Sequence, residues 1–334
     1  MWIAPALAVA LIAAPAAAEE TLLNVSLDSE LDGPLAAFVV ALERGYFTDE
    51  GLVVTLNSGY SALAPIKSVA SGESEMGFTD INALIKFNDQ NPDAGLKAIY
   101  IVYDKPAFAI IGRKGLGVSA PKDLEGKTLG APATDPAFEY WSAFVEATGI
   151  DASKVTIENV GTAEREAKLA EGKVQAITGL SFNEVLDLEA VGIGSVDTAV
   201  MLMGDHGLDL YGNAIFVRPA FAGANPQAVK GFVRAFNKAL KDTIADPETA
   251  ARILGSVDPV KRGEKEPKRL KLALEQVIVT DAVKANGLGA VDMERLARAI
   301  DQIGVGYDFA NKPTPESVFD PSFLPDAAER MLGP

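Results

Sequence analysis

The residues that could carry out acid–base or nucleophilic chemistry are few in this chain. Its one histidine, His206, lies in Gly204-Asp205-His206-Gly207, and there is no cysteine. General-base catalysis would rest on His206 alone, and a lone histidine in a glycine-flanked loop is typical of a surface residue. The absence of cysteine excludes disulfides, thiolate nucleophiles and thiolate metal sites. The sequence therefore predicts no catalytic residue and no metal site.

Ser181 is the residue whose surroundings imitate a catalytic nucleophile. Its segment, Gly179-Leu180-Ser181-Phe182-Asn183, lacks the second glycine of a hydrolase nucleophile turn. No glycine-rich dinucleotide motif follows the first predicted strand, and no phosphate-loop motif is present. We therefore expect no cofactor and a chain that holds a small molecule rather than one that transforms it.

Polar and aromatic residues follow the ends of several predicted strands, where ligands bind in α/β sheets. Helix N-termini at that edge also direct free N–H groups toward a ligand. We expect ligand contacts from Asp28, Tyr60, Ser61, Ala62, Thr79, Asp80, Thr134, Phe138, Arg165, Ser181, Asn183, Tyr211 and Asn213.

The segment Tyr60-Ser61-Ala62 is the sharpest of these candidates. Tyr60 can stack on a planar molecule, or pack on the surface. Ser61 suits a helix N-cap, and the N–H groups beside it can hold a carboxylate, a sulfonate or the polar edge of a ring. Asp28 and Asp80 can accept from a ring N–H or an amine, or else cap helices.

Two candidates in the middle of the chain have competing roles. Phe138 and Trp141 lie three residues apart, which predicts core packing for Trp141 and a cleft position for Phe138. Arg165 can bind an anion through two N–H groups, or pair with the neighbouring Glu164 and Glu166.

The charge balance limits the partners and the ligand. The chain of 334 residues has 46 acidic and 30 basic residues, a formal net charge of −16. Such a surface repels phosphate backbones and anionic headgroups, so no nucleic acid is expected. The acidic candidates also disfavour a highly charged anion. We expect a planar, neutral or singly charged ligand, such as a pyrimidine-like compound or an aromatic acid, with an alkanesulfonate or taurine as the alternative.

Strand and helix patterns alternate along the chain, which predicts parallel sheets covered by helices on both faces. Strands are expected at 22–27, 52–56, 75–80, 96–102, 108–111, 127–131, 155–160, 175–180, 198–203 and 213–218. Helices are expected at 34–44, 61–70, 81–88, 136–148, 163–171, 183–191, 226–244, 267–279 and 291–303.

The segment 213–218 has the same character as 108–113, a short strand ending at arginine. This repetition predicts a compact α/β unit, 109–211, inserted into a larger one formed by 19–108 plus 212–334. The chain then crosses between the units twice, near 105–108 and 210–213, and two adjacent crossovers form a hinge. The predicted fold is that of a type II periplasmic binding protein: two α/β lobes joined by two crossover strands, with a ligand cleft between them.

The first 18 residues are typical of an export segment. They carry no charged side chain and contain an apolar stretch, 6–14, before Ala16-Ala17-Ala18. Alanine at these positions ahead of Glu19 matches a signal-peptidase site, so cleavage after Ala18 is expected. The N-terminal part of this segment lacks the Lys or Arg that a signal peptide usually has. Without cysteine for a lipid anchor, the mature protein is expected to be free in the periplasm.

Several short motifs carry a family resemblance. Gly45-Tyr46-Phe47 with Asp49-Glu50-Gly51-Leu52 resembles a stretch of the NMT1/THI5-like solute-binding proteins, which bind alkanesulfonates, taurine, nitrate and pyrimidines. The segments 59–62, 69–72 and 76–80 match that family further along, and 121–127 is similar to the opening of the second lobe in many type II binders.

This resemblance, which includes the SsuA-like proteins, implies a monomeric periplasmic binding protein that delivers its ligand to an ABC permease in the inner membrane. Two alternatives remain: a binding protein that presents its ligand to a sensor, and an exported enzyme on the same fold. The family's pyrimidine synthases act with a cysteine-rich motif, which this chain lacks.

Overall fold

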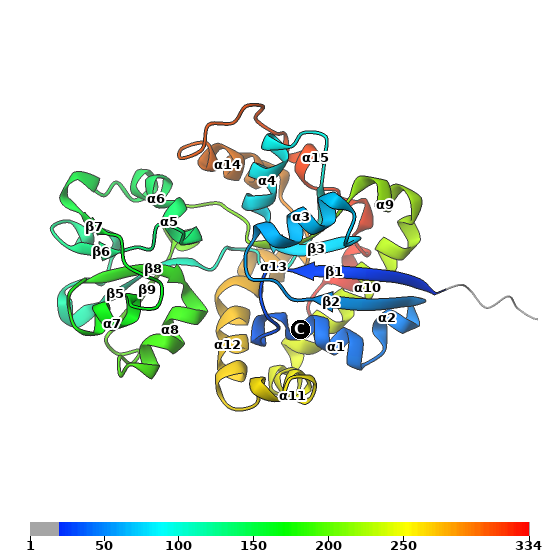
Figure 1. The fold of residues 1–334 in the computed structure, drawn as a ribbon, viewed down its shortest axis with the longest axis horizontal. Coiled ribbons are helices and arrows are strands. Elements are labelled where there is room, and N and C mark those ends of the chain that lie inside the picture. Colours follow the sequence, from blue (N-terminus) through cyan, green and yellow to red (C-terminus); the bar gives the residue numbers. More distant parts are fainter. Residues whose placement is uncertain (1–19, 334) are drawn as a thin grey trace, which may run out of the picture.

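The computed structural model describes residues 20–333, which form two lobes side by side (Figure 1). Each lobe is built on one five-stranded sheet. Within this range no helix has the length and apolarity needed to cross a membrane. The expected export segment and its cleavage site at Ala18 lie outside the described residues.

The sheet of the first lobe has the strand order β2-β1-β3-β10-β4. Its strands are β1 (Thr21–Leu27), β2 (Leu52–Asn57), β3 (Met76–Asp80), β4 (Lys97–Ile101) and β10 (Asn213–Val217). β1 runs parallel to β2 and β3, so the ends of these three strands point to the same edge. β10 runs antiparallel to β3 and β4.

The sheet of the second lobe has the order β7-β6-β8-β5-β9 and is drawn from residues 108–202. Its strands are β5 (Phe108–Arg113), β6 (Thr128–Gly130), β7 (Thr156–Glu158), β8 (Ala176–Leu180) and β9 (Thr198–Leu202). β5 runs antiparallel to both neighbours. Purely parallel sheets were therefore the wrong expectation. β5 and β10 arrive from the other lobe rather than through a covering helix, so they enter each sheet in the opposite direction.

Helices cover both faces of each sheet (Figure 1). In the first lobe they are α1 (Ala36–Glu43), α2 (Tyr46–Asp49), α3 (Leu63–Ser71), α4 (Ile81–Gln90), α9 (Pro219–Ala224), α10 (Pro226–Ala245), α11 (Pro247–Val257), α12 (Lys265–Ala273), α13 (Asp281–Asn286), α14 (Met293–Ile303), α15 (Pro315–Val318) and α16 (Ala327–Arg330). In the second they are α5 (Pro136–Glu139), α6 (Trp141–Thr148), α7 (Arg165–Ala170) and α8 (Ser181–Ala190).

Several helical details differ from expectation, and the short helices α2, α9, α13, α15 and α16 were not expected. The helix expected over 136–148 breaks at Tyr140 into α5 and α6. α11 was not expected; Asp246 caps it by accepting from Thr249 N at 3.0 Å, and Pro247 occupies its first turn, where no N–H is needed. α12 continues into a π-helical turn, Leu274–Ile278.

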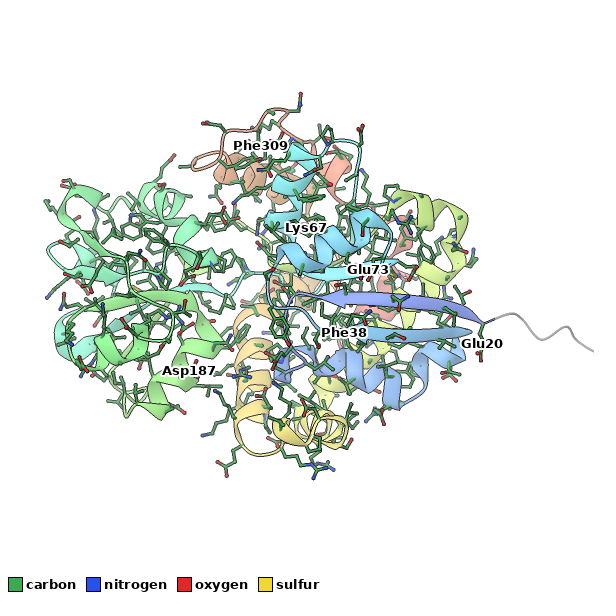
Figure 2. The ribbon with its side chains drawn as sticks, in the orientation of Figure 1. Glu20, Phe38, Lys67, Glu73, Asp187 and Phe309 are labelled. Carbon is green, nitrogen blue, oxygen red and sulfur yellow. The ribbon has the colours of Figure 1, made fainter. Side chains whose placement is uncertain are left out.

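An aromatic cluster fills the core of the first lobe and reaches toward the second. Phe38 lies 5.3 Å from Phe78 and 4.4 Å from Phe236, ring centre to ring centre. Phe78 in turn meets Tyr103 edge-on at 5.7 Å. Edge-on and tilted packing of this kind suits the ring quadrupoles. The core therefore supports Tyr103, which lies where the chain leaves this lobe; Figure 2 shows Phe38 among the side chains beneath the sheet.

The two crossovers lie side by side and are joined by backbone hydrogen bonds. Gly212 N donates to Tyr103 O at 2.9 Å, and Val102 N and Tyr103 N donate to Asn213 O at 2.9 and 3.0 Å. A Cβ on Gly212 would lie 2.8 Å from both Lys105 O and Tyr103 Cβ. The close approach of the crossovers thus requires glycine at position 212.

Candidate ligand-binding cleft

A cavity of about 1070 Å³ lies between the lobes and is lined by residues of both. It meets the carboxyl ends of β1 and β3, as expected for an α/β sheet. Its walls include Asp28, Asp32, Tyr60, Ser61, Ala62, Asp80, Lys86, Tyr103, Asn213 and Tyr307 from the first lobe, and Phe108, Thr134, Asp135, Phe138, Glu139, Phe182 and Asn183 from the second.

Asp28 and Asn213 form one side of this cleft. Asn213 Nδ2 donates to Asp28 Oδ2 at 2.7 Å, which joins the end of β1 to the start of β10. Burial raises the pKa of Asp28 to about 7, and the hydrogen bond from Asn213 only partly opposes that effect. The Asp28 carboxyl can therefore accept or donate a hydrogen bond near neutral pH.

Asp80 has the capping role that the sequence left open, and it also lines the cleft. Its Oδ1 accepts from Asn82 N at 3.3 Å and from Asn82 Nδ2 at 2.7 Å at the start of α4. Burial raises the pKa of Asp80 to about 6, and burial likewise raises the pKa of Asp32 to about 6. Three carboxyls with raised pKa values therefore face this cavity.

The loop after β2 brings an aromatic ring to the cleft. A Cβ on Gly59 would lie 2.2 Å from Leu27 O, so glycine lets this loop lie against the end of β1. Tyr60 follows and is 84% exposed, a large ring with few contacts to the protein. The expected N-cap at Ser61 is wrong: α3 begins at Leu63 after Ala62, and no side chain caps it. Tyr60, Ser61 and Ala62 nevertheless all line the cleft.

The second lobe supplies Thr134, Phe138 and Asn183 to the opposite wall, at positions where the sequence placed them. Asp135 caps α5 by accepting from Ala137 N at 2.8 Å, which sets the direction of the helix that carries Phe138. The ring of Tyr140, where the helix breaks, stacks on Phe108 at 5.2 Å.

Four of the expected residues, Arg165 among them, do not line this cleft. Thr79 is fully buried and donates to Ala62 O at 2.9 Å. Ser181 is also buried, and its Oγ lies 2.6 Å from Gln276 Oε1. Tyr211 accepts from Asp292 N at 2.9 Å and lines a different cavity. Thr79 lies within β3, where side-chain direction alternates and turns it away from its neighbour Asp80. Ser181 begins α8 and is directed to Gln276, and Tyr211 precedes β10 on the second crossover.

Arg165 lies in a neighbouring cavity of about 530 Å³ rather than in the main cleft. Its guanidinium pairs with Asp135 at 3.1 Å, with Glu166 at 2.8 Å and with Glu184. Burial and the hydrogen bond with Glu166 raise the pKa of Glu184 to about 9. The N–H groups of Arg165 therefore serve an ion-pair network inside the second lobe, as its acidic neighbours suggested.

Several residues that line the cleft were not among the ligand contacts expected from the sequence. Lys86 Nζ lies 2.7 Å from Glu139 Oε1 and 4.5 Å from the centre of the Tyr140 ring, so it bridges the two lobes. A lysine in the middle of a helix is typical of a surface residue, so no feature of the sequence indicated Lys86 at the cleft. Tyr103 lies on the first crossover, and Tyr307 lies beyond α14, far from any strand end.

The one histidine of the chain lies away from the cleft. His206 is in the second lobe, edge-on to Phe144 at 6.1 Å, and does not line the cleft. Across residues 20–333, no three side chains of the metal-ligating types gather to hold a metal ion.

Comparison with known proteins shows three similar chains. The riboflavin-binding protein RibY of Chloroflexus aurantiacus is 28% identical over 216 residues, which are 64% of this chain and 60% of that protein. The formylaminopyrimidine-binding protein of Halalkalibacterium halodurans is 25% identical over 219 residues, 64% of each chain. A 4-amino-5-hydroxymethyl-2-methylpyrimidine phosphate synthase of Aspergillus parasiticus is 23% identical over 238 residues, 67% of each.

Solved structures share the fold. The periplasmic aliphatic sulphonate binding protein SsuA of Escherichia coli matches with a TM-score of 0.70 at 14% identity, over 90% of this chain and 98% of that one. The desulfurization enzyme DSZB matches with a TM-score of 0.62 at 14% identity, over 91% and 98%. The expected periplasmic-binding-protein fold is thus confirmed.

The sequence family is shown by a separate match. The model of the family described as NMT1/THI5 like matches residues 34–250, which include four strands of the first sheet (β2, β3, β4 and β10) and all of the second sheet. The chain therefore belongs to the NMT1/THI5-like family.

Proposed function

We propose that this protein is an exported solute-binding protein that closes its two lobes around a planar nitrogen heterocycle and delivers it to an ABC permease. The observation that carries the proposal is the cavity of about 1070 Å³ whose walls combine carboxyls and aromatic rings from two lobes. A molecule held between them makes contacts with both, so it favours the form in which the lobes are close together.

The cleft chemistry supports a heterocycle over an alkanesulfonate. Asp28 and Asp80 offer oxygens to ring N–H groups, and Tyr60 and Phe138 offer rings for stacking. The lysine of the cleft, Lys86, is already paired with Glu139, so a sulfonate would face buried carboxyls without a free cation. Riboflavin and formylaminopyrimidine, for which two relatives are named, are planar rings with N–H groups.

Binding rather than catalysis is the proposed role, because His206 lies away from the cleft and packs on Phe144. The synthase among the relatives and the enzyme among the solved structures make turnover worth measuring. We expect a bound heterocycle to be recovered chemically unchanged after prolonged incubation, and to be recovered equally from the His206→Ala variant.

Export, delivery and the monomeric state complete the proposal. The uncharged, alanine-rich segment 1–18 supports cleavage after Ala18 and release into the periplasm. N-terminal sequencing of the protein recovered from osmotic-shock fluid tests this step, with Glu19 expected as the first residue. Size-exclusion chromatography with light scattering tests the monomer.

The decisive experiment is calorimetry with riboflavin, formylaminopyrimidine and ethanesulfonate. A ligand that binds only the folded state also raises the melting temperature, and at 100 times Kd it stabilises by about 2.7 kcal/mol. We expect one of the two heterocycles to bind and ethanesulfonate not to bind. Binding of ethanesulfonate alone would contradict the proposed ligand class, and binding of none of the three would contradict the proposed function.

A further inference from the structure

One arginine of the first lobe holds both crossovers at once. Arg295, on α14, donates through Nη2 to Asp104 O at 2.5 Å and to Leu210 O at 2.9 Å. Its Nε donates to Asp209 O at 3.0 Å, and its Nη1 pairs with Asp104 Oδ1 at 2.8 Å. The side chain is 15% exposed. The rigid fork of a guanidinium can reach these acceptors together, which a lysine cannot.

Neighbouring groups complete this attachment. The guanidinium carbon of Arg295 lies 4.0 Å from the centre of the Tyr211 ring on the second crossover. The other oxygen of Asp104 accepts from Thr280 Oγ1, at the start of α13, at 2.6 Å. Asp104 therefore contacts α13 and α14, and Tyr211 contacts α14, all in the first lobe.

Apolar packing supports the crossovers as well: Tyr103 packs on Phe78, and Leu210 and Tyr211 belong to a buried apolar cluster. A cavity of about 380 Å³ lies beside the crossovers and is lined by Asp104, Tyr211 and Arg295. The adjacent residues Tyr103 and Asn213 line the ligand cleft instead. Some crossover side chains thus face a cavity, and there the directed hydrogen bonds of Arg295 add to the apolar packing.

Hydrogen bonds also limit where the first crossover can bend. Lys105 N donates to Val277 O, in the first lobe, at 3.3 Å. Two residues later, Ala107 O accepts from Ser181 N, in the second lobe, at 2.8 Å. The bend between lobes therefore falls on the short stretch around Pro106, just beyond the segment that Arg295 holds.

We propose that Arg295 is a positioning residue for lobe closure. It fixes both crossovers to the first lobe. The lobes then turn about one axis, and the two walls of the cleft come to lie opposite each other around the ligand. This role rests on the proposed function, in which closure captures the ligand. Residues that confine a hinge change affinity without touching the ligand.

The test measures the distance between the lobes directly. Because the chain has no cysteine, spin labels attach only at the introduced pair Lys67→Cys and Glu146→Cys, exposed positions on α3 and α6. Double electron–electron resonance then compares the parent with Arg295→Ala, Arg295→Lys and the control Arg298→Ala. Arg298 lies one turn along α14, is 54% exposed and pairs with the Asp209 side chain.

We expect Arg295→Ala to broaden the ligand-free distance distribution and to weaken riboflavin or formylaminopyrimidine binding on the order of tenfold. Arg295→Lys should give an intermediate width, and Arg298→Ala should match the parent. A parental distribution for Arg295→Ala, with circular dichroism showing a folded protein, would overturn the proposal. If Arg295→Ala does not fold, a parental distribution for Arg295→Lys would overturn it equally.

The interlobe distance distributions measured without ligand test the role of Arg295 independently of the proposed function. If the parent shows the same distance with and without each heterocycle, closure on these ligands fails. A broadened ligand-free distribution for Arg295→Ala would still assign Arg295 to the hinge in that case.

Discussion

Asn213 Nδ2 donates to Asp28 Oδ2 at 2.7 Å, although 185 positions separate the two residues in the chain. The contact joins the first strand of the first lobe to the strand that returns after the whole second lobe has been inserted. It places a half-buried carboxyl beside the second crossover and inside the cleft.

Asp28→Asn should change how stability depends on pH. The pKa of Asp28 is about 7 in the folded protein against an ordinary 3.8, so the folded state holds its proton more tightly than the unfolded state. The contribution of Asp28 to stability is then greatest below pH 3.8 and is lost as the pH rises from 3.8 to 7. The variant lacks this loss, and we expect it to be more stable than the parent at pH 8 by up to about 4 kcal/mol.

Urea unfolding at pH 5 and pH 8 measures this difference. Asp32 and Asp80 also have raised pKa values, so part of the fall with pH should remain in the variant. Glu146→Gln, on the exposed face of α6, serves as the control and should keep the parental pH dependence. Equal slopes for Asp28→Asn and the parent would contradict a raised pKa for Asp28.

Tyr60→Ala should weaken ligand binding without lowering stability. The ring lines the cleft but is 84% exposed, so folding gains little from it. Loss of an aromatic stack on a planar ring costs about 1–3 kcal/mol of binding free energy. Calorimetry with the bound heterocycle measures the change, and Tyr60→Phe, which keeps the ring, should retain most of the affinity. Unchanged affinity in Tyr60→Ala would exclude stacking by this residue.

The ion pair between Lys86 and Glu139 should contribute to holding the lobes together. Lys86 belongs to α4 of the first lobe and Glu139 to α5 of the second, with 2.7 Å between their charged atoms. A double-mutant cycle with Lys86→Met and Glu139→Gln should give a coupling of about 0.2–1 kcal/mol in ligand binding. The coupling should shrink in high salt, because Glu139 is 56% exposed.

A second interlobe pair provides a comparison for this cycle. Lys265 on α12 and Asp187 on α8 lie 3.0 Å apart, with Asp187 on the side of the second lobe that faces α12 (Figure 2). Both side chains are more exposed than Lys86, so their coupling should be weaker. A zero coupling for Lys86 and Glu139 at low salt would show that their contact does not contribute to closure.

Gly212→Ala should destabilise the protein, because its Cβ would come within 2.8 Å of the first crossover. Overpacking of this kind costs about 1–3 kcal/mol. Gly223→Ala is the matched control: a Cβ there meets nothing within 4 Å, and the residue lies in α9, where alanine is favoured. Thermal unfolding of both variants measures the effect, and equal melting temperatures would contradict a requirement for glycine at position 212.

Much of the architecture followed from the sequence. Each expected strand occurs, with small shifts at its ends, because a buried strand must be a short apolar run between turn residues. The likeness of 213–218 to 108–113 indicated an inserted unit, and these segments became β10 and β5, the strands that enter each sheet after a crossing.

The direction in which each strand runs relative to its neighbours could not be predicted from the sequence. Apolar periodicity indicates which residues are buried. A strand buried on both faces has the same apolar pattern whether it runs parallel or antiparallel to its neighbours. β5 and β10 were therefore expected to run parallel to their neighbours and run antiparallel instead. The path of the chain between lobes, which is a property of the tertiary structure, set their direction.

For the cleft too, some residues could be predicted from the sequence and others depend on the tertiary structure. The sequence by itself determined that residues after β1, β2 and β3 meet at one edge, and Asp28, Tyr60 and Asp80 are there. It did not determine which side chains turn inward: Thr79, next to Asp80, is buried against Ala62. Lys86 and Tyr103 line the cleft only because the two lobes face each other, and that contact between distant segments is made by packing, which no local pattern of residues encodes.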